Sequence, residues 1–333
     1  MRRFHAALGA VLLFLTGGAG HAQEGAPEPV ELQSFQIKRF ALGSAETRFG
    51  SLEFVGGLEL SAQDRRFGQF SGLRFLSPGE EFIGVADHGY WFRGRVERDG
   101  DLVPVRVSDF SLQAMVDANG NAVDAKEDKD AEGLEVHDGI ATVAFERDAR
   151  IVEYAIGPGG IGGPLREIDF VVPRNELRYN QGFETIARAP DGGHLDGARI
   201  VVAERSIDTE GNIFAAIVEG PQRGIFKVRR SGDFDVTDGA FLPDGDLLLL
   251  ERRFSIAQGV AMRLRRIEAE TLMPGALVDG TILMQADLAY RIDNMEALDV
   301  WQRDDGKTIV SLVSDDNQSF LQRTIYLEFV LVD

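Results

Sequence analysis

The chain of 333 residues contains no cysteine. It therefore has no disulfide framework and no thiol nucleophile, and it has no cysteine through which a lipoprotein anchor could form. Histidine is also scarce. Beyond the N-terminal stretch only His88, His137 and His194 occur, far apart in the sequence, which argues against a zinc site. A Gly-x-Ser-x-Gly motif is absent as well, so a serine hydrolase lacks its usual marker.

Basic residues are fewer than acidic ones. Asp and Glu number 54 against 35 Lys and Arg, which gives a formal net charge of −19, and Lys in particular is rare. Nucleic acid is bound by clustered Lys and Arg, so the composition argues against a nucleic-acid partner. An anionic small molecule remains a possible substrate, but an acidic surface repels it unless cations intervene.

Long apolar runs are missing after the N-terminus. Residues 1–22 combine a basic start at Arg2 and Arg3, an apolar stretch and a small-x-small cleavage site, which predicts a signal peptide for either the general or the twin-arginine export route. No later run is long enough for a membrane anchor. We therefore expect an exported protein, in the periplasm or outside the cell, with a flexible leader over 23–33 and a single domain over 34–333. We also expect a monomer.

What the sequence does contain is a repeat. Each copy is a strand, a turn of the Asp-Gly type and a second apolar strand that ends on an acidic residue. The equivalent positions Ser71, Glu132, Glu184, Asp238 and Glu296 are 52 to 61 residues apart. This spacing suits a propeller blade of about 40 to 50 residues with longer loops.

Two further strand-like runs, 49–60 and 324–332, have no partner in their own repeat. An unpaired blade edge would expose a row of backbone donors and acceptors, so we expect these two runs to pair. Five repeats and this pair predict an all-β, six-bladed β-propeller closed by pairing of the N- and C-terminal strands.

The repeats place acidic residues at matching positions, which in a propeller form rings around the central tunnel. Carboxylates that converge on one axis repel each other unless they are protonated, paired with Arg or bound to a cation. Ca²⁺ suits them because it takes about 6 to 8 oxygen ligands in flexible geometry. The predicted metal ligands are Asp87, Glu132, Glu184, Glu296 and Asp315, with Glu146, Glu204, Glu251 and Asp316 as secondary candidates.

Arginines follow several of these acids, and two interpretations stay open. Each Glu pairs with an Arg of a neighbouring blade as a structural tie, or Arg and Ca²⁺ together form an anion site. In the second case Arg205 and Arg252 are the catalytic candidates, with His88 at the tunnel mouth as a general acid or base. All these positions depend on the repeat phase, since a slip of one residue turns a strand's side chains to the opposite face.

The motifs resemble the bacterial phytase-like family, also called "esterase-like activity of phytase". The residues that carry the resemblance are 70–73 with 86–89, 130–134, 182–187, 238–245 with 250–255, and 293–298 with 314–317. The resemblance implies a β-propeller and a Ca²⁺-dependent phosphoric ester hydrolase. A non-catalytic binding module of the cell envelope and a carboxylesterase are the alternatives. The histidine-acid phytase motif Arg-His-Gly-x-Arg-x-Pro is absent, and the scarcity of Lys departs from a site for a highly phosphorylated substrate.

Overall fold

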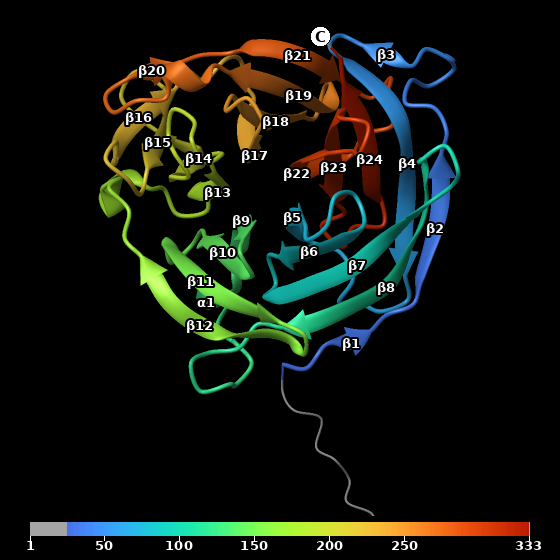
Figure 1. The fold of residues 1–333 in the computed structure, drawn as a ribbon, viewed down its shortest axis with the longest axis horizontal. Helices are drawn as coiled ribbons and strands as arrows, with labels where there is room; N and C mark the ends of the chain where they lie inside the picture. Colours follow the sequence, from blue (N-terminus) through green and yellow to red (C-terminus); the bar gives the residue numbers. More distant parts are fainter. Residues whose placement is uncertain (1–24, 333) are drawn as a thin grey trace, which may run out of the picture.

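The computed structural model describes residues 25–332. Five antiparallel sheets stand around a common centre like the blades of a propeller (Figure 1). The innermost strands β5, β9, β13, β17 and β22 contact one another in sequence around the ring, and β22 returns to β5. The predicted signal peptide, 1–22, lies outside the described residues.

The first two blades follow the chain from inside to outside. Blade 1 consists of β5 (Phe70–Phe75), β6 (Glu81–Ala86), β7 (Tyr90–Arg98) and β8 (Pro104–Ala114), with β1 (Glu28–Pro29) on its outer edge. After the short helix α1 (Lys126–Lys129), blade 2 consists of β9 (Ala131–His137), β10 (Ile140–Phe145), β11 (Arg150–Gly157) and β12 (Gly160–Ile168).

Blades 3 and 4 are built in the same way. Blade 3 contains β13 (Phe183–Arg188), β14 (Arg199–Ile207), β15 (Ile213–Ile217) and β16 (Gly224–Val228), with β20 (Leu277–Val278) added in parallel. Blade 4 contains β17 (Asp235–Phe241), β18 (Leu247–Ser255), β19 (Gly259–Ile267) and β21 (Thr281–Ala286). Two 3-10 turns, η1 (Arg174–Glu176) and η2 (Ala269–Thr271), lie in the connections.

Blade 5 joins the two ends of the chain. Its inner strands β22 (Asn294–Gln302), β23 (Thr308–Asp315) and β24 (Thr324–Leu331) come from the C-terminal region. Its outer strands β4 (Leu52–Ala62) and β2 (Leu32–Ile37) come from the N-terminal region, and β3 (Arg48–Phe49) also pairs with β4. The expected antiparallel pairing of the terminal strands is therefore present, between β4 and β24.

Two predictions from the sequence need correction. The described chain forms five blades, not six, because the terminal strands complete the fifth repeat instead of building a blade of their own. The leader predicted over 23–33 is not loose throughout, since β1 pairs with β8 and the beginning of β2 pairs with β4. The N-terminal segment thus contacts the outer edges of both blade 1 and blade 5.

The sequence explains the blades directly. Turns such as Asp138-Gly139 have both residues at positive φ, 48° and 73°, as a two-residue hairpin of the right twist requires. Apolar strands pack face to face between blades in four buried clusters. At the closure, Phe40 packs its ring against Phe54 and Phe329.

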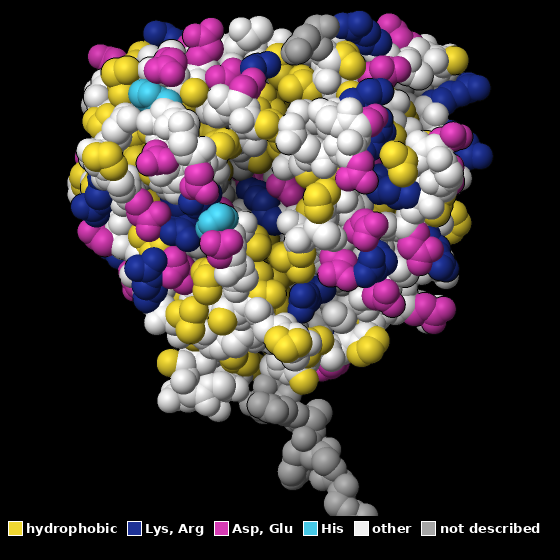
Figure 2. All heavy atoms as spheres, viewed as in Figure 1, with side chains coloured by type: hydrophobic (Ala, Val, Ile, Leu, Met, Phe, Trp, Pro, Cys, Tyr) yellow, Lys and Arg dark blue, Asp and Glu magenta, His cyan; other side chains and the backbone are white. Residues whose placement is uncertain are grey.

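Figure 2 shows one face of the molecule, hollowed near its centre, with acidic and basic side chains interspersed across it. Among residues 25–332, no helix is long and apolar enough to cross a membrane.

Candidate functional site

Every inner strand carries a β-bulge at the same repeat position. In β9, for example, Ala131 pairs with Phe145 and Gly133 pairs with Ala144, so Glu132 has no backbone pairing partner in β10. A bulge re-aims the side chain of its extra residue. The five bulge residues, here called the bulge ring, are Ser71, Glu132, Glu184, Thr237 and Glu296.

A second ring lies at the ends of the second strands. Each member pairs, backbone to backbone, with the residue two positions before the bulge residue of the same blade. In blade 3, for instance, the Glu204 N–H donates to the carbonyl oxygen of Gly182, two residues before Glu184, at 2.7 Å. This strand-end ring consists of Asp87, Glu146, Glu204, Arg252 and Asp315. Seven of the ten residues in the two rings are acidic, and Arg252 is the single cation among them. We call the end of the tunnel where the rings lie the acidic mouth.

Blade 4 departs from the predicted phase by one residue. Val236 pairs with Glu251 and Asp238 with Leu250, so Thr237 and Arg252 occupy the ring positions. Glu251 is fully buried and paired with Arg263 and with Arg265, whose Nη2 lies 2.5 Å from Glu251 Oε1. Glu251 therefore forms a structural tie inside blade 4, and its prediction as a secondary metal ligand is wrong.

Carboxylates crowd together at the mouth in two overlapping groups. Ligand oxygens of Asp130, Glu132 and Glu146 all lie within 4.8 Å of one another, and so do those of Glu146, Glu184 and Glu204. Because Glu146 belongs to both groups, five carboxylates form one continuous cluster. The cluster joins blades 2 and 3.

Most of the ring acids have a hydrogen-bond donor or a cation nearby. Glu146 accepts the Gly182 N–H at 3.0 Å, and Asp87 accepts the Gln69 amide at 3.0 Å. Asp315 accepts the Asn317 N–H at 2.8 Å.

Arg252 serves two of the acids. Its Nε lies 3.2 Å from Glu296 and its Nη2 lies 3.7 Å from Glu204. Glu296 also accepts the Asn294 amide at 2.7 Å. One guanidinium thus faces two carboxylates from different blades.

Glu184 is the exception. Its side chain belongs to a residue that is 9% exposed, and within residues 25–332 it has neither a hydrogen bond nor an ion pair. A buried carboxylate without a partner is costly unless it is protonated or bound to a cation. One oxygen of Asp87, Oδ1, is fully buried without a hydrogen bond, whereas the Glu184 oxygens keep some contact with solvent.

The crowding shifts the acid–base behaviour of the mouth. Burial, and then the charges of Glu132 and Glu204, raise the pKa of Glu184 well above its usual 4.5. Burial likewise raises the pKa of Glu146 to about 7 and that of Glu204 to about 8. Burial is also the main cause that raises the pKa of Asp315 to about 8. Near neutral pH the mouth therefore retains protons.

The remaining predicted residues lie at different distances from this cluster. Arg205 is partly exposed and faces Asp235 at 3.5 Å, so it contacts neither ring directly. His88 Nε2 lies 3.1 Å from the Arg66 carbonyl, and its Nδ1 lies 3.6 Å from Asp87 Oδ1. Asp316 accepts hydrogen bonds from Gln318 N–H and Thr324 Oγ1, one residue beyond the strand-end ring.

Sequence reasoning missed Asp130 as a site residue. Its carboxylate belongs to the cluster and also accepts Arg147 Nε at 2.5 Å. The Asp-x-Glu spacing of Asp130 and Glu132 was the available signal, because residues two apart on a regular strand share a face. The sequence repeat places Ser71 at an equivalent position, but Thr237 had no such signal because it is not acidic and its neighbour Asp238 is.

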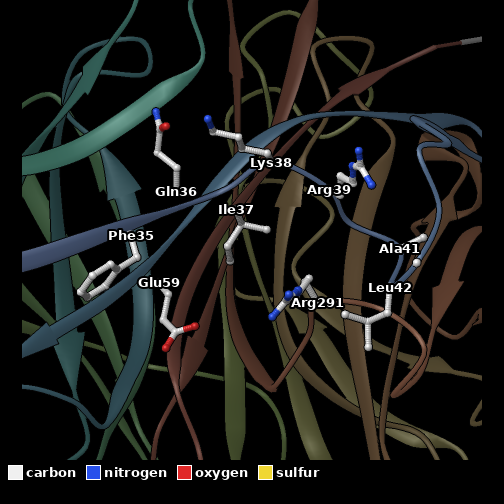
Figure 3. Close-up of a pocket in the computed structure, with 10 residues that line it drawn as sticks. Phe35, Gln36, Ile37, Lys38, Arg39, Ala41, Leu42, Glu59 and Arg291 are labelled. Carbon is white, nitrogen blue, oxygen red and sulfur yellow. The ribbon is translucent and has the colours of Figure 1, made fainter.

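Another cavity, of about 460 Å³, lies outside the ring against β2 and Arg291. In Figure 3 the side chains of Gln36, Lys38 and Arg39 extend to one side of the strand, while Phe35 and Arg291 extend to the other. Its cationic groups therefore do not converge on a shared point, and we place the functional site at the acidic mouth.

Comparison with known proteins identifies a family. The profile described as "Phytase-like: Esterase-like activity of phytase" matches residues 65–318, which include nearly all of the residues in and around both rings. No curated protein matches the sequence.

Solved structures give only weak similarity. The PQQ-bound aldose sugar dehydrogenase of Streptomyces coelicolor is 14% identical, with a TM-score of 0.44 over 91% of this chain and 100% of that one. An endo-arabinase of Bacteroides thetaiotaomicron is 11% identical, with a TM-score of 0.45 over 87% of this chain and 96% of that one. These values support no inference about activity.

Proposed function

The chain belongs to the phytase-like family, and from this premise we propose that it is an exported, Ca²⁺-dependent phosphoric ester hydrolase that acts at the acidic mouth. The observation that carries the proposal is Glu184, a residue only 9% exposed whose carboxylate lies in a cluster of carboxylates and has no hydrogen bond or ion pair within residues 25–332. A bound cation would supply the missing partner.

The residues fit a hard divalent cation. All the candidate ligands are carboxylate oxygens, with no sulfur and no imidazole in either group of the cluster. Oxygen-only sites favour Ca²⁺ or Mg²⁺, and Ca²⁺ tolerates the irregular geometry of ligands from several blades better. We propose Glu132, Glu146, Glu184 and Glu204 as its principal ligands, with Asp87, Glu296 and Asp315 around them.

A bound Ca²⁺ would neutralise the charge of a phosphoryl group and favour its attack by water. The chain's own residues would do the rest. Arg252, already placed between Glu204 and Glu296, is positioned to donate hydrogen bonds to a phosphate oxygen. Asp315, which is not one of the four principal ligands and holds a proton near neutral pH, would donate it to the leaving alcohol.

His88 would act as a general acid or base in this proposal. Its Nε2 lies 3.1 Å from the Arg66 carbonyl oxygen and its Nδ1 lies 3.6 Å from Asp87 Oδ1, beside the strand-end ring. Arg205 would act from farther away, because its present partner is Asp235.

The test is phosphate release from a panel of phosphoric esters, measured with chelator and again after Ca²⁺ is restored, beside thermal melts under the same conditions. We expect Ca²⁺ to raise both the melting temperature and the rate. If Ca²⁺ changes neither, the acids are structural groups and the proposal fails. If it raises only the melting temperature, the non-catalytic binding module is favoured.

Export is part of the same proposal, with residues 1–22 as the signal peptide. Mass spectrometry of protein recovered from the periplasm or the medium should give a mature chain that begins at Gln23. Recovery of the uncleaved chain from the cytoplasm alone would contradict it.

A further inference from the structure

A second cavity, of about 570 Å³, opens beside the acidic mouth between blades 4 and 5. It is enclosed by the β18–β19 hairpin, the segment that precedes β22 and the loop between β23 and β24. Its size is that of a small-molecule pocket. Arg252 and Asn294 line the cavity and also contact Glu296 in the bulge ring, so the cavity adjoins the mouth.

One side of this pocket is apolar. Phe254, Leu288 and Leu321 line it although each is more than half exposed, together with the more buried Val260 and Ile292. Exposed apolar residues scattered singly are ordinary, but three that face one cavity mark a surface that binds something apolar.

The β18–β19 hairpin packs closely against Leu288. Gly259 has φ of +69°, and a Cβ there would lie 2.4 Å from Leu288 Cδ1. Glycine therefore allows both the tight turn and the close packing of Leu288 over it.

The charged residues of the pocket limit how many anionic groups the ligand can carry. Its cations are Arg252 and Arg323, and each already faces carboxylates, with Arg323 Nε 3.5 Å from Asp293. Seven acids surround the adjoining mouth. A ligand with many phosphates would meet far more negative than positive charge, whereas one anionic group on an apolar body would not.

We propose that this pocket, beside the acidic mouth, binds the apolar group of a phosphoric monoester, so that the substrate is an amphipathic ester and not a highly phosphorylated polyol. The part of this inference that concerns the phosphate group rests on the proposed function. The part that concerns the apolar group rests on the pocket alone.

The experiment compares 3-phenylpropyl phosphate with glycerol 1-phosphate, both of which release a primary alcohol, in the presence of Ca²⁺. We expect kcat/KM to be about tenfold or more higher for the phenylpropyl ester, as apolar pockets commonly discriminate. The double variant Leu288→Gln/Leu321→Gln should abolish this preference. The matched control is Leu42→Gln, at a half-exposed leucine in the other cavity, and it should retain it.

A second readout needs no catalysis. Fluorescence of 1-anilinonaphthalene-8-sulfonate should rise on binding to the native protein and to the Leu42→Gln variant, and should fall in the double variant. Equal hydrolysis of the two esters, or a preference that survives in the double variant, would overturn the inference and leave the proposed function standing.

If neither ester is hydrolysed, the proposed function fails. The dye fluorescence then tests separately whether the pocket binds an apolar group. Dye binding that is lost in the double variant supports the pocket. Binding that is unchanged there overturns it.

Discussion

At the scale of single residues, two buried glutamates show how environment separates a candidate ligand from a structural group. Glu184 has no hydrogen bond or ion pair within the described chain, whereas Glu251 is held between Arg263 and Arg265. Both follow or begin apolar strand segments, so their sequences look alike. Their partners, which come from other strands, decide their roles.

Replacing Glu184 by Gln should weaken calcium binding. The neutral amide keeps the shape of the side chain but removes one negative ligand, so the affinity for Ca²⁺ should fall by about tenfold or more. The same change relieves repulsion, so the melting temperature in chelator should not fall. Calcium titration by calorimetry, together with melts in chelator, measures both effects.

Glu251→Gln is the matched control. It removes the counter-charge of the buried Arg263 and one of the two carboxylate partners of Arg265, which should cost about 3 to 5 kcal/mol of unfolding free energy. The loss should be the same with and without Ca²⁺. A loss of calcium affinity in this variant, with normal affinity in Glu184→Gln, would reverse the assignment.

The raised pKa values at the mouth predict how stability depends on pH. Glu146, Glu204 and Asp315 hold protons in the folded chain up to about pH 7 to 8 but release them in the unfolded chain near 4.5 or 3.8. The folded state therefore binds more protons between these limits, and stability falls as pH rises through them.

Melts in chelator should show this decline from pH 5 to pH 8. With Ca²⁺ present, the stabilisation by the ion should grow over pH 7 to 8, because binding requires the deprotonated carboxylates. A melting temperature that rises with pH in chelator would show that the acids are ionised and paired throughout.

At the scale of strands, the sequence predicted the repeat well and its register less well. The acids at 87, 132, 146, 184, 204, 296 and 315 all reach the mouth, because the apolar spacing around them is regular. Blade 4 differs because its Glu251-Arg252 pair imitates Glu146-Arg147 and Glu204-Arg205 in sequence while lying one residue out of phase. The ring residues of blade 4, Thr237 and Arg252, are not acidic, whereas their neighbours Asp238 and Glu251 are, so the pattern of acids pointed to the wrong pair.

The blade count failed for a related reason. Five repeats were visible and five blades exist, but the fifth repeat supplies only three strands of its own. Its missing outer strand is β4, from the N-terminal region. Strand-like patterns show that an edge needs a partner, but they do not show in which sheet the partner lies.

The closure of blade 5 can be tested at Gly57, in β4. A Cβ at this position would lie 2.6 Å from the Tyr326 carbonyl oxygen and 2.8 Å from Leu327 Cδ2, both in β24. Gly57→Ala should therefore force the terminal strands apart and cost about 1 to 3 kcal/mol. Denaturant unfolding measures the loss.

Gly162→Ala serves as the control, because a Cβ at Gly162, in β12, meets nothing within 4 Å. It should leave stability nearly unchanged. Equal stability losses for the two substitutions would mean that the close contact between β4 and β24 does not contribute to stability.

At the scale of the whole molecule, the blades are linked across the tunnel by one buried arginine. Arg74, from blade 1, donates two hydrogen bonds to Asp238 in blade 4, at 2.8 and 2.9 Å. It also donates to the Leu298 carbonyl in blade 5 at 2.6 Å. Blades 1 and 4 are not neighbours in the ring, so this pair connects inner strands from opposite sides of it.

This link explains why Asp238 is acidic although it is not a ring residue. Its carboxylate also accepts the Leu298 N–H at 2.8 Å, so it organises the inner strands of blades 4 and 5 as well as Arg74. Burial raises the pKa of Asp238 above its usual value, and the charge of Arg74 opposes that rise without cancelling it.

Arg74→Met should therefore destabilise the whole ring and not one blade. It leaves Asp238 buried without its cation, at a cost of about 3 to 5 kcal/mol, and unfolding should remain one cooperative transition. The double variant Arg74→Met/Asp238→Leu removes both charges and should recover part of the loss, because a buried ion pair replaced by apolar residues is often neutral. Chemical denaturation of the wild type, Arg74→Met, Asp238→Leu and the double variant measures the coupling, and strictly additive losses would show that the two residues act independently.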